Sequence, residues 1–120
     1  MKAIQVRGHG GPEVLEYTEL AVPTTRPGEI LVRTEAIGVN FIDTYHRSGD
    51  YAVELPFVPG DEASGIVEVV GPGVQGFAPG DRVAWTSPFG SYAEFVAVPA
   101  SAAVKVPSGL PAEVAASALA

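Results

Sequence analysis

The segment of residues 38–51, GVNFIDTYHRSGDY, gathers more chemically versatile side chains than any other stretch of this sequence. It combines an amide, a carboxylate, two phenols, an imidazole and a guanidinium. Tyrosine hydroxyls can donate hydrogen bonds to a carbonyl oxygen and so polarise it. Because most of the remaining chain is typical of strands and turns, we expect any chemistry of this protein to lie in this segment.

Several side chains of this segment fit two interpretations each. Asp43 follows Asn40 by three residues, so it suits a carboxylate that caps a helix or a charge that positions a partner in a cleft. Tyr45 and Tyr51 suit half-buried aromatics of a small β domain as well as hydroxyl donors to a substrate. Arg47 is most simply a solvated charge at the negative end of a helix dipole.

Metal-ligating side chains lack the paired spacing that is typical of zinc sites. The sequence has no cysteine and two histidines, and His9 lies in a predicted hairpin turn. Four further groups can meet only if the fold brings them together: Asp43, His46, Asp61 and Glu62. We therefore predict no metal site. A G-x-S-x-G nucleophile elbow is also absent from the sequence, so hydrolysis has no support.

The run Gly71-Pro-Gly73-Val-Gln-Gly76 matches the G-x-G-x-x-G spacing of dinucleotide-binding loops. Such a loop needs a helix immediately after it, whose N–H groups bind the pyrophosphate. The next residues, Phe-Ala-Pro-Gly-Asp, cannot continue a helix, and Pro72 removes a backbone donor from the loop. We predict a turn between two strands here instead.

The elements that position residues 38–51 are mostly short strands bounded by Gly or Pro, typical of a barrel or sandwich. Strands are expected at residues 2–7, 14–20, 29–37, 63–70, 82–86, 92–98 and 103–106. A short helix is expected at residues 41–47, with Asn40 as its N-cap and Gly49 at its end. A second helix is expected within residues 111–120, where Pro111 and Glu113 precede an alanine-rich run.

Composition excludes several classes of protein. The 120 residues suit one domain, and 47% hydrophobic with 18% charged residues suits a folded core. A net charge of −7 without a basic stripe argues against nucleic acid as a partner. No apolar run reaches the length of a membrane span, and the absence of cysteine favours the cytoplasm.

Six motifs in order resemble a known family. They are GGPEVLE (10–16), residues 38–51, VPGDEASGIV (58–67), VGPGV (70–74), PGDRV (79–83) and GSYAEF (90–95). Together they resemble the amino-terminal part of the NADPH:quinone oxidoreductases, the zeta-crystallin-like branch of the medium-chain dehydrogenase/reductases. Zinc-dependent members of that superfamily carry a cysteine at the place of Asn40, Gly-His-Glu at the place of residues 60–62, and a four-cysteine lobe. The resemblance therefore implies a zinc-independent enzyme.

The same resemblance implies a mostly β fold, a GroES-like, partly open β-barrel with short helices. Residues 1–120 would form an incomplete amino-terminal catalytic domain, with residues 111–120 starting a helix that leads to a Rossmann nucleotide-binding domain. Later chain would return to cover apolar surface of the barrel, and the full-length protein would be a homodimer. NADPH would pass a hydride to a quinone or an α,β-unsaturated carbonyl, while the 120-residue piece alone would be inactive.

Residue roles implied by the resemblance fall within residues 38–51. Asn40 would hydrogen-bond the nicotinamide side of NADPH, and Asp43 would orient the short helix. Tyr45 and Tyr51 would line the substrate pocket, with Tyr51 a candidate proton donor. Two alternatives stay open: an enoyl-thioester reductase module, which shares much of this motif, and a non-catalytic β-barrel used for binding or structure.

Overall fold

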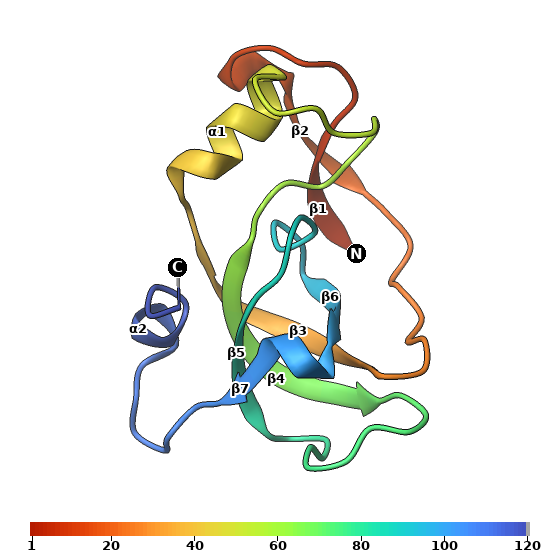
Figure 1. The fold of residues 1–120 in the computed structure, drawn as a ribbon, viewed down its shortest axis with the longest axis vertical. Helices are drawn as coiled ribbons and strands as arrows, with labels where there is room; N and C mark the ends of the chain where they lie inside the picture. The colour runs from red at the N-terminus through yellow and green to blue at the C-terminus, as the bar shows by residue number, and fades with distance from the viewer. Residues whose placement is uncertain (120) are drawn as a thin grey trace.

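The computed structural model describes residues 1–119, and most of its regular structure is strand (Figure 1). The strands are β1 (Lys2–Val6), β2 (Leu15–Glu19), β3 (Glu29–Gly38), β4 (Glu62–Val70), β5 (Arg82–Thr86), β6 (Phe95–Pro99) and β7 (Ala103–Lys105). The helices are α1 (Phe41–Ser48) and α2 (Ala112–Ala115), with single 3-10 turns at η1 (Pro12–Val14) and η2 (Ala100–Ala102). The prediction of a mostly β fold with short helices is confirmed.

Five strands form one antiparallel sheet in the order β6-β3-β4-β5-β7, and β1 and β2 pair separately. Bridges from Ala3 to Ala93 and from Val6 to Phe57 attach the β1-β2 pair to the rest of the fold. Within the described residues, β6 and β7 at the two ends of the sheet do not pair with each other. The sheet is therefore open and does not close into a barrel.

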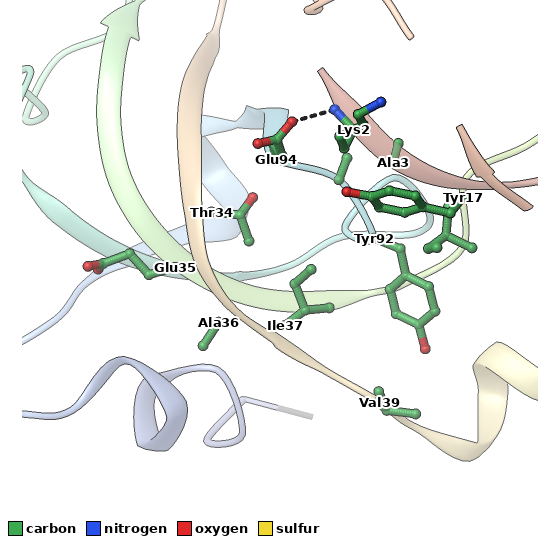
Figure 2. A pocket seen from close by; sticks show the side chains of 12 residues that line it. Lys2, Ala3, Tyr17, Thr34, Glu35, Ala36, Ile37, Val39, Tyr92 and Glu94 are labelled. Carbon is green, nitrogen blue, oxygen red and sulfur yellow. Dashed lines mark hydrogen bonds between the residues drawn. The ribbon is translucent and has the colours of Figure 1, made fainter. Parts of the chain in front are cut away.

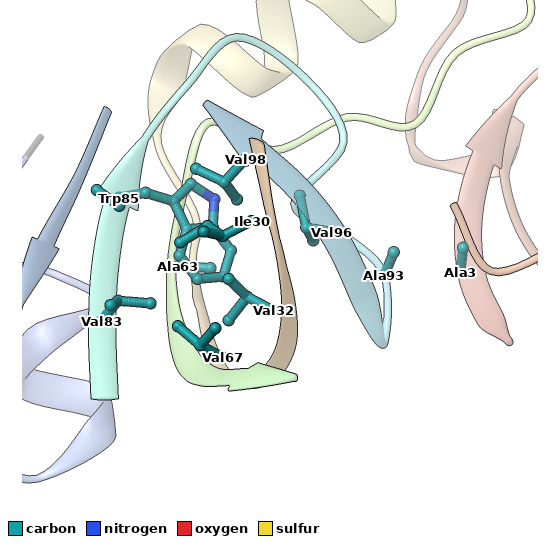
Figure 3. Packing of buried hydrophobic residues seen from close by; sticks show 11 residues of the cluster. Ala3, Ile30, Val32, Ala63, Val67, Val83, Trp85, Ala93, Val96 and Val98 are labelled. Atoms are coloured by element: carbon teal, nitrogen blue, oxygen red, sulfur yellow. The ribbon is translucent and has the colours of Figure 1, made fainter. Parts of the chain in front are cut away.

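Apolar side chains from all five strands of the larger sheet, together with Ala3 of β1 and Ala93, form the core (Figure 3). Ile30 and Val32 of β3 are fully buried. They are two residues apart, so they point to the same face of the strand. Trp85 is the largest fully buried side chain, and its indole N–H donates to Ser91 Oγ at 3.0 Å. That bond satisfies a polar atom which would otherwise be costly to bury.

Two strands begin later than predicted. The strand expected from residue 14 begins at Leu15, because the 3-10 turn Pro12–Val14 precedes it. The strand expected from residue 92 begins at Phe95. Some backbone groups of Tyr92 and Glu94 bond β1 instead: the Ile4 N–H donates to Tyr92 O, and the Glu94 N–H donates to Lys2 O. Residues 92–94 therefore connect the two sheets and do not extend β6.

The predicted helix in residues 111–120 is much shorter than expected. It begins after Pro111 but ends at Ala115, and Ala120 lies outside the described residues. Ser117 Oγ donates to the carbonyls of Glu113 and Val114, which gives these terminal groups a side-chain partner instead of another helical turn. Neither α1 nor α2 is long and apolar enough to cross a membrane.

The glycine run at residues 71–76 lies in the turn between β4 and β5, as predicted. No helix follows it within the described chain before β5. The Gly71 N–H donates to Glu29 O and the Gly28 N–H donates to Pro72 O, so the run packs against the start of β3. It has the environment of a strand connection and lacks the helix that a pyrophosphate site requires.

Gly65 in the middle of β4 is required by the close approach of β3. A Cβ atom built at Gly65 would overlap the carbonyl oxygen of Arg33, a backbone atom that cannot turn aside. We predict that Gly65→Ala lowers the free energy of unfolding by about 1–3 kcal/mol, the usual cost of overpacking. Urea unfolding of the protein that carries this domain measures the change.

Gly8→Ala is the matched control, because nothing lies within 4 Å of a Cβ at that position. Equal stability of the two variants would contradict the steric explanation for Gly65.

Candidate functional site

Helix α1 is held at both ends by local interactions, and it forms within one residue of the predicted bounds. Asn40 occupies the N-cap with extended backbone, and the Asp43 carboxylate Oδ2 accepts the Asn40 N–H at 3.0 Å. A carboxylate in the first helical turn also interacts favourably with the helix dipole. At the other end Gly49 adopts the left-handed conformation, φ 90°, and its N–H donates to Tyr45 O.

Asp43 also connects α1 to the loop before β6. The Tyr92 hydroxyl donates to Asp43 Oδ2 at 2.8 Å, and the Asp43 side chain is 4% exposed. Burial first, and the neighbouring Asp43 carboxylate second, raise the pKa of Tyr92 well above its ordinary value. The protonated phenol is therefore held as a donor, and one carboxylate oxygen holds both the helix start and the β6 loop.

The two faces of α1 differ sharply in exposure. Phe41 and Tyr45, one helical turn apart, are 84% and 42% exposed, whereas Asp43 and His46 are buried. Tyr51, just after the helix, is 53% exposed and its ring meets that of Tyr45 edge-on with 5.5 Å between centroids. The structure thus brings Tyr45 and Tyr51 together on an accessible surface, where aromatic rings and hydroxyls can meet a planar ligand.

Asn40 lies beside a buried carboxylate that sequence analysis did not pair with it. Asn40 Nδ2 donates to Glu62 Oε1 at 3.3 Å, and Glu62 Oε2 accepts the Leu119 N–H at 2.9 Å. Glu62 itself is 2% exposed, so its position is strongly constrained. Because an amide NH₂ group has two hydrogens, Asn40 can hold this bond and still donate to a ligand.

Three of the four groups considered as metal ligands come together. Asp43, His46 and Asp61 each offer one ligand atom, and these atoms all lie within 4.8 Å of one another. Asp61 Oδ1 accepts the Phe89 N–H at 3.1 Å, and the Phe89 ring meets the His46 ring edge-on at 4.7 Å. The fourth group, Glu62, is bonded to Asn40 instead.

A groove of about 490 Å³ has a lining that includes neither Tyr45 nor Tyr51. Figure 2 shows the residues that line it. Its walls come from β1, β2, β3 and the segment before β6, and they include Tyr17, Ile37, Val39 and Tyr92. A bond from the Lys2 N–H to the Glu94 carboxylate closes one side. Tyr92 joins the groove to the α1 site, because its ring lines the groove while its hydroxyl bonds Asp43.

Fold and site together define a small open β domain in which one capped helix presents aromatic and amide groups to solvent. Residues 26–108 match the family described as the alcohol dehydrogenase GroES-like domain. The chain belongs to this family, and the predicted GroES-like fold is confirmed. Resemblance to quinone oxidoreductases is confirmed as well by the relatives that follow.

Two relatives and one solved structure show the extent of the similarity. The quinone oxidoreductase of Pseudomonas aeruginosa is 48% identical over 117 residues, which cover 96% of this chain and 36% of that protein. A 2-haloacrylate reductase of a Burkholderia species is 42% identical over 113 residues, covering 90% and 34%. The Escherichia coli quinone oxidoreductase complexed with NADPH matches with a TM-score of 0.95 and 42% identity, covering 98% and 37%. This chain thus spans about a third of their length.

Two partners of the site were missed in the sequence. Tyr92 was assigned to a strand, and the hydrogen bond from its hydroxyl to Asp43 was not predicted. Glu62 was considered only as a metal ligand, and its bond with Asn40 was not predicted. No local pattern connects Tyr92 to Asp43, since their contact is created by the folding of the sheet. The spacing of Asp43 and His46 was a usable signal, because residues three apart share one helix face.

Because the pKa of Tyr92 is raised, the contribution of its hydroxyl to stability should depend on pH. Below its ordinary pKa of 10 the hydroxyl is protonated in both the folded and unfolded states, so its contribution to stability is fully present. Above that value the unfolded state loses its proton first, and the contribution disappears as pH rises. We predict that the absorbance difference between wild-type and Tyr92→Phe protein shows a phenol that ionises well above pH 10. A difference that titrates near the ordinary value would contradict the Asp43–Tyr92 bond.

Proposed function

We propose that this chain is the substrate-side domain of an NADPH-dependent reductase that transfers a hydride to quinones or α,β-unsaturated carbonyls without zinc. The observation that supports this most directly is the exposed pair Tyr45–Tyr51 at the helix that Asn40 caps, in a domain 48% identical to a quinone oxidoreductase. Similarity to a 2-haloacrylate reductase supports the unsaturated substrates, since a haloacrylate has a carbon–carbon double bond conjugated to a carboxylate.

The chain's own residues bind and orient the reactants in this proposal. NADPH supplies the hydride when it is bound. Asn40, held through Nδ2 by Glu62, donates its second amide hydrogen to the nicotinamide side of the cofactor. Tyr45 and Tyr51 stack against the substrate, and the Tyr51 hydroxyl donates a hydrogen bond to the oxygen that becomes more negative as the hydride arrives.

Zinc independence rests on the residues that stand at the zinc-ligand positions of related dehydrogenases. Asn40 replaces a cysteine and Asp61 replaces a histidine, and the chain contains no cysteine. An amide side chain is a poor zinc ligand compared with a thiolate. In this proposal the Tyr51 hydroxyl takes the polarising role that a zinc ion has in those enzymes.

The remaining parts of the enzyme are also proposals. Residues 1–120 form the amino-terminal catalytic domain, and a Rossmann domain in the rest of the full-length protein binds most of NADPH. Later chain covers the apolar groove lined by Tyr17 and Val39, which are 72% and 76% exposed here. The full-length protein is a homodimer in the cytoplasm and takes a small-molecule substrate.

Turnover by the full-length protein tests the function. We expect it to oxidise NADPH with small quinones and enones, and to keep this activity after exhaustive chelation of metals. Faster turnover with enoyl-thioesters than with quinones would favour the acyl-thioester alternative. Tight NADPH binding with no turnover on any of these substrates would favour a non-catalytic binding protein.

Asn40→Ala tests the cofactor contact. Because the variant removes the amide that reaches toward the nicotinamide, we expect the KM for NADPH to rise about tenfold, the equivalent of one hydrogen bond of roughly 1.4 kcal/mol. Steady-state kinetics at saturating quinone measures this. An unchanged KM would assign Asn40 to capping of α1 alone.

Tyr51→Phe tests the proton or hydrogen-bond donor. The ring remains and the hydroxyl is lost, so we expect about 1–3 kcal/mol less transition-state stabilisation with enones. Tyr45→Phe is the control at the neighbouring ring and is expected to change kcat much less. Equal kinetics of wild-type and Tyr51→Phe enzyme would reduce Tyr51 to pocket lining.

A further inference from the structure

We propose that Asp43, His46 and Asp61 form a structural divalent-cation site that fastens the buried face of α1 to the segment before β4. This site goes beyond the proposed hydride transfer, because its two helix ligands, Asp43 and His46, are buried whereas Tyr45 is exposed. It also replaces the sequence-based prediction of no metal site, which rested only on spacing along the chain.

The three ligands converge from two separate segments. Asp43 and His46 lie three residues apart on one face of α1 and are 4% and 9% exposed. Asp61 is half-buried and directly precedes β4. One ligand atom from each side chain lies within 4.8 Å of the other two. An ion between them would therefore join a helix to the sheet.

Two buried atoms of this cluster are left without a partner among the described residues. Asp43 Oδ1 and His46 Nδ1 are both inaccessible to solvent and form no hydrogen bond there. Such atoms are uncommon in folded proteins, because each costs roughly 1–3 kcal/mol. Both belong to side chains that bind divalent cations, and a bound ion would satisfy both at once.

One oxygen of each carboxylate is already bonded to protein donors. Asp43 Oδ2 accepts the Asn40 N–H and the Tyr92 hydroxyl, and Asp61 Oδ1 accepts the Phe89 N–H. Metal ligands are typically oriented by hydrogen bonds of this kind, which hold the coordinating atom toward the ion.

The local charge also favours a cation. Two carboxylates lie close together in a mostly buried place, where their repulsion is poorly screened. Within residues 1–119, the ion pairs of the structure include neither Asp43 nor Asp61. Arg47 is a nearby cation on the same helix, but its Nε donates to the Gly10 carbonyl. A divalent ion would neutralise the pair directly.

Mixed carboxylate and imidazole ligands select a first-row transition ion such as Zn²⁺ over Mg²⁺ or Ca²⁺. Zinc binds such ligands at about 2.0–2.2 Å, which places neighbouring ligand atoms about 3.4 Å apart. The ligand atoms therefore need to approach one another by up to about 1.4 Å from the present limit of 4.8 Å. Water reaches the ion from the half-exposed Asp61 side and completes its coordination.

The experiment uses the full-length, chelator-stripped protein titrated with Zn²⁺ by calorimetry, with Mg²⁺ as a competitor. We expect one equivalent of Zn²⁺ to bind, to raise the Tm and to leave kcat unchanged. Asp61→Asn and His46→Gln should each weaken this binding at least about tenfold, since even outer-shell changes have effects of that size. Millimolar Mg²⁺ should not displace the zinc.

His9→Gln is the matched control, because His9 is an exposed histidine near the end of α1 whose ring contacts Arg47 O. Zinc binding unaffected by His46→Gln and Asp61→Asn, or reduced equally by His9→Gln, would overturn the proposal. X-ray absorption of the zinc-loaded wild-type protein requires no variant to fold. A first shell of oxygen and nitrogen with one imidazole supports the site, and a shell that contains sulfur or no imidazole refutes it.

Discussion

The buried Asp43 carboxylate is the contact on which the candidate site depends. One of its oxygens accepts the N–H that begins α1 and the hydroxyl of Tyr92, which belongs to the loop that bridges both sheets. Charge-assisted bonds of this kind are stronger than neutral ones and lose little to solvent when buried. This group therefore helps to fix the orientation of α1, together with the bonds from Asn40 to Glu62 and from Arg47 to Gly10.

The two faces of α1 carry different kinds of side chain, one buried and one exposed. The buried face carries Asp43 and His46 toward Asp61, and the exposed face carries Tyr45 beside Tyr51. Asn40, at the start of the helix, is tied to Glu62 in the central strand β4. The sheet therefore positions a short helix with accessible groups, which the proposed function uses to contact a cofactor and a substrate.

Differences between prediction and structure arise where contacts between distant segments override local signals. The alanine-rich end of the chain has high helix propensity, yet α2 ends at Ala115 and the Leu119 N–H bonds Glu62 of β4. Residues 92–94 have strand-like composition, but some of their backbone groups bond β1 and so connect the two sheets. The cap at Asn40 and the left-handed Gly49 were predictable because both depend on neighbouring residues alone.

The sequence by itself determined the mostly β class, the position and ends of α1, and the turn at residues 71–76, since each follows from periodicity or local backbone chemistry. It also placed the chain in its family through motifs spread over most of its length. Only the tertiary structure decided which side chains meet. The pairs Tyr92–Asp43 and Asn40–Glu62, and the convergence of His46 on Asp61, join residues that the chain holds far apart. Such contacts depend on sheet register and on where buried polar groups find partners, which no local pattern specifies.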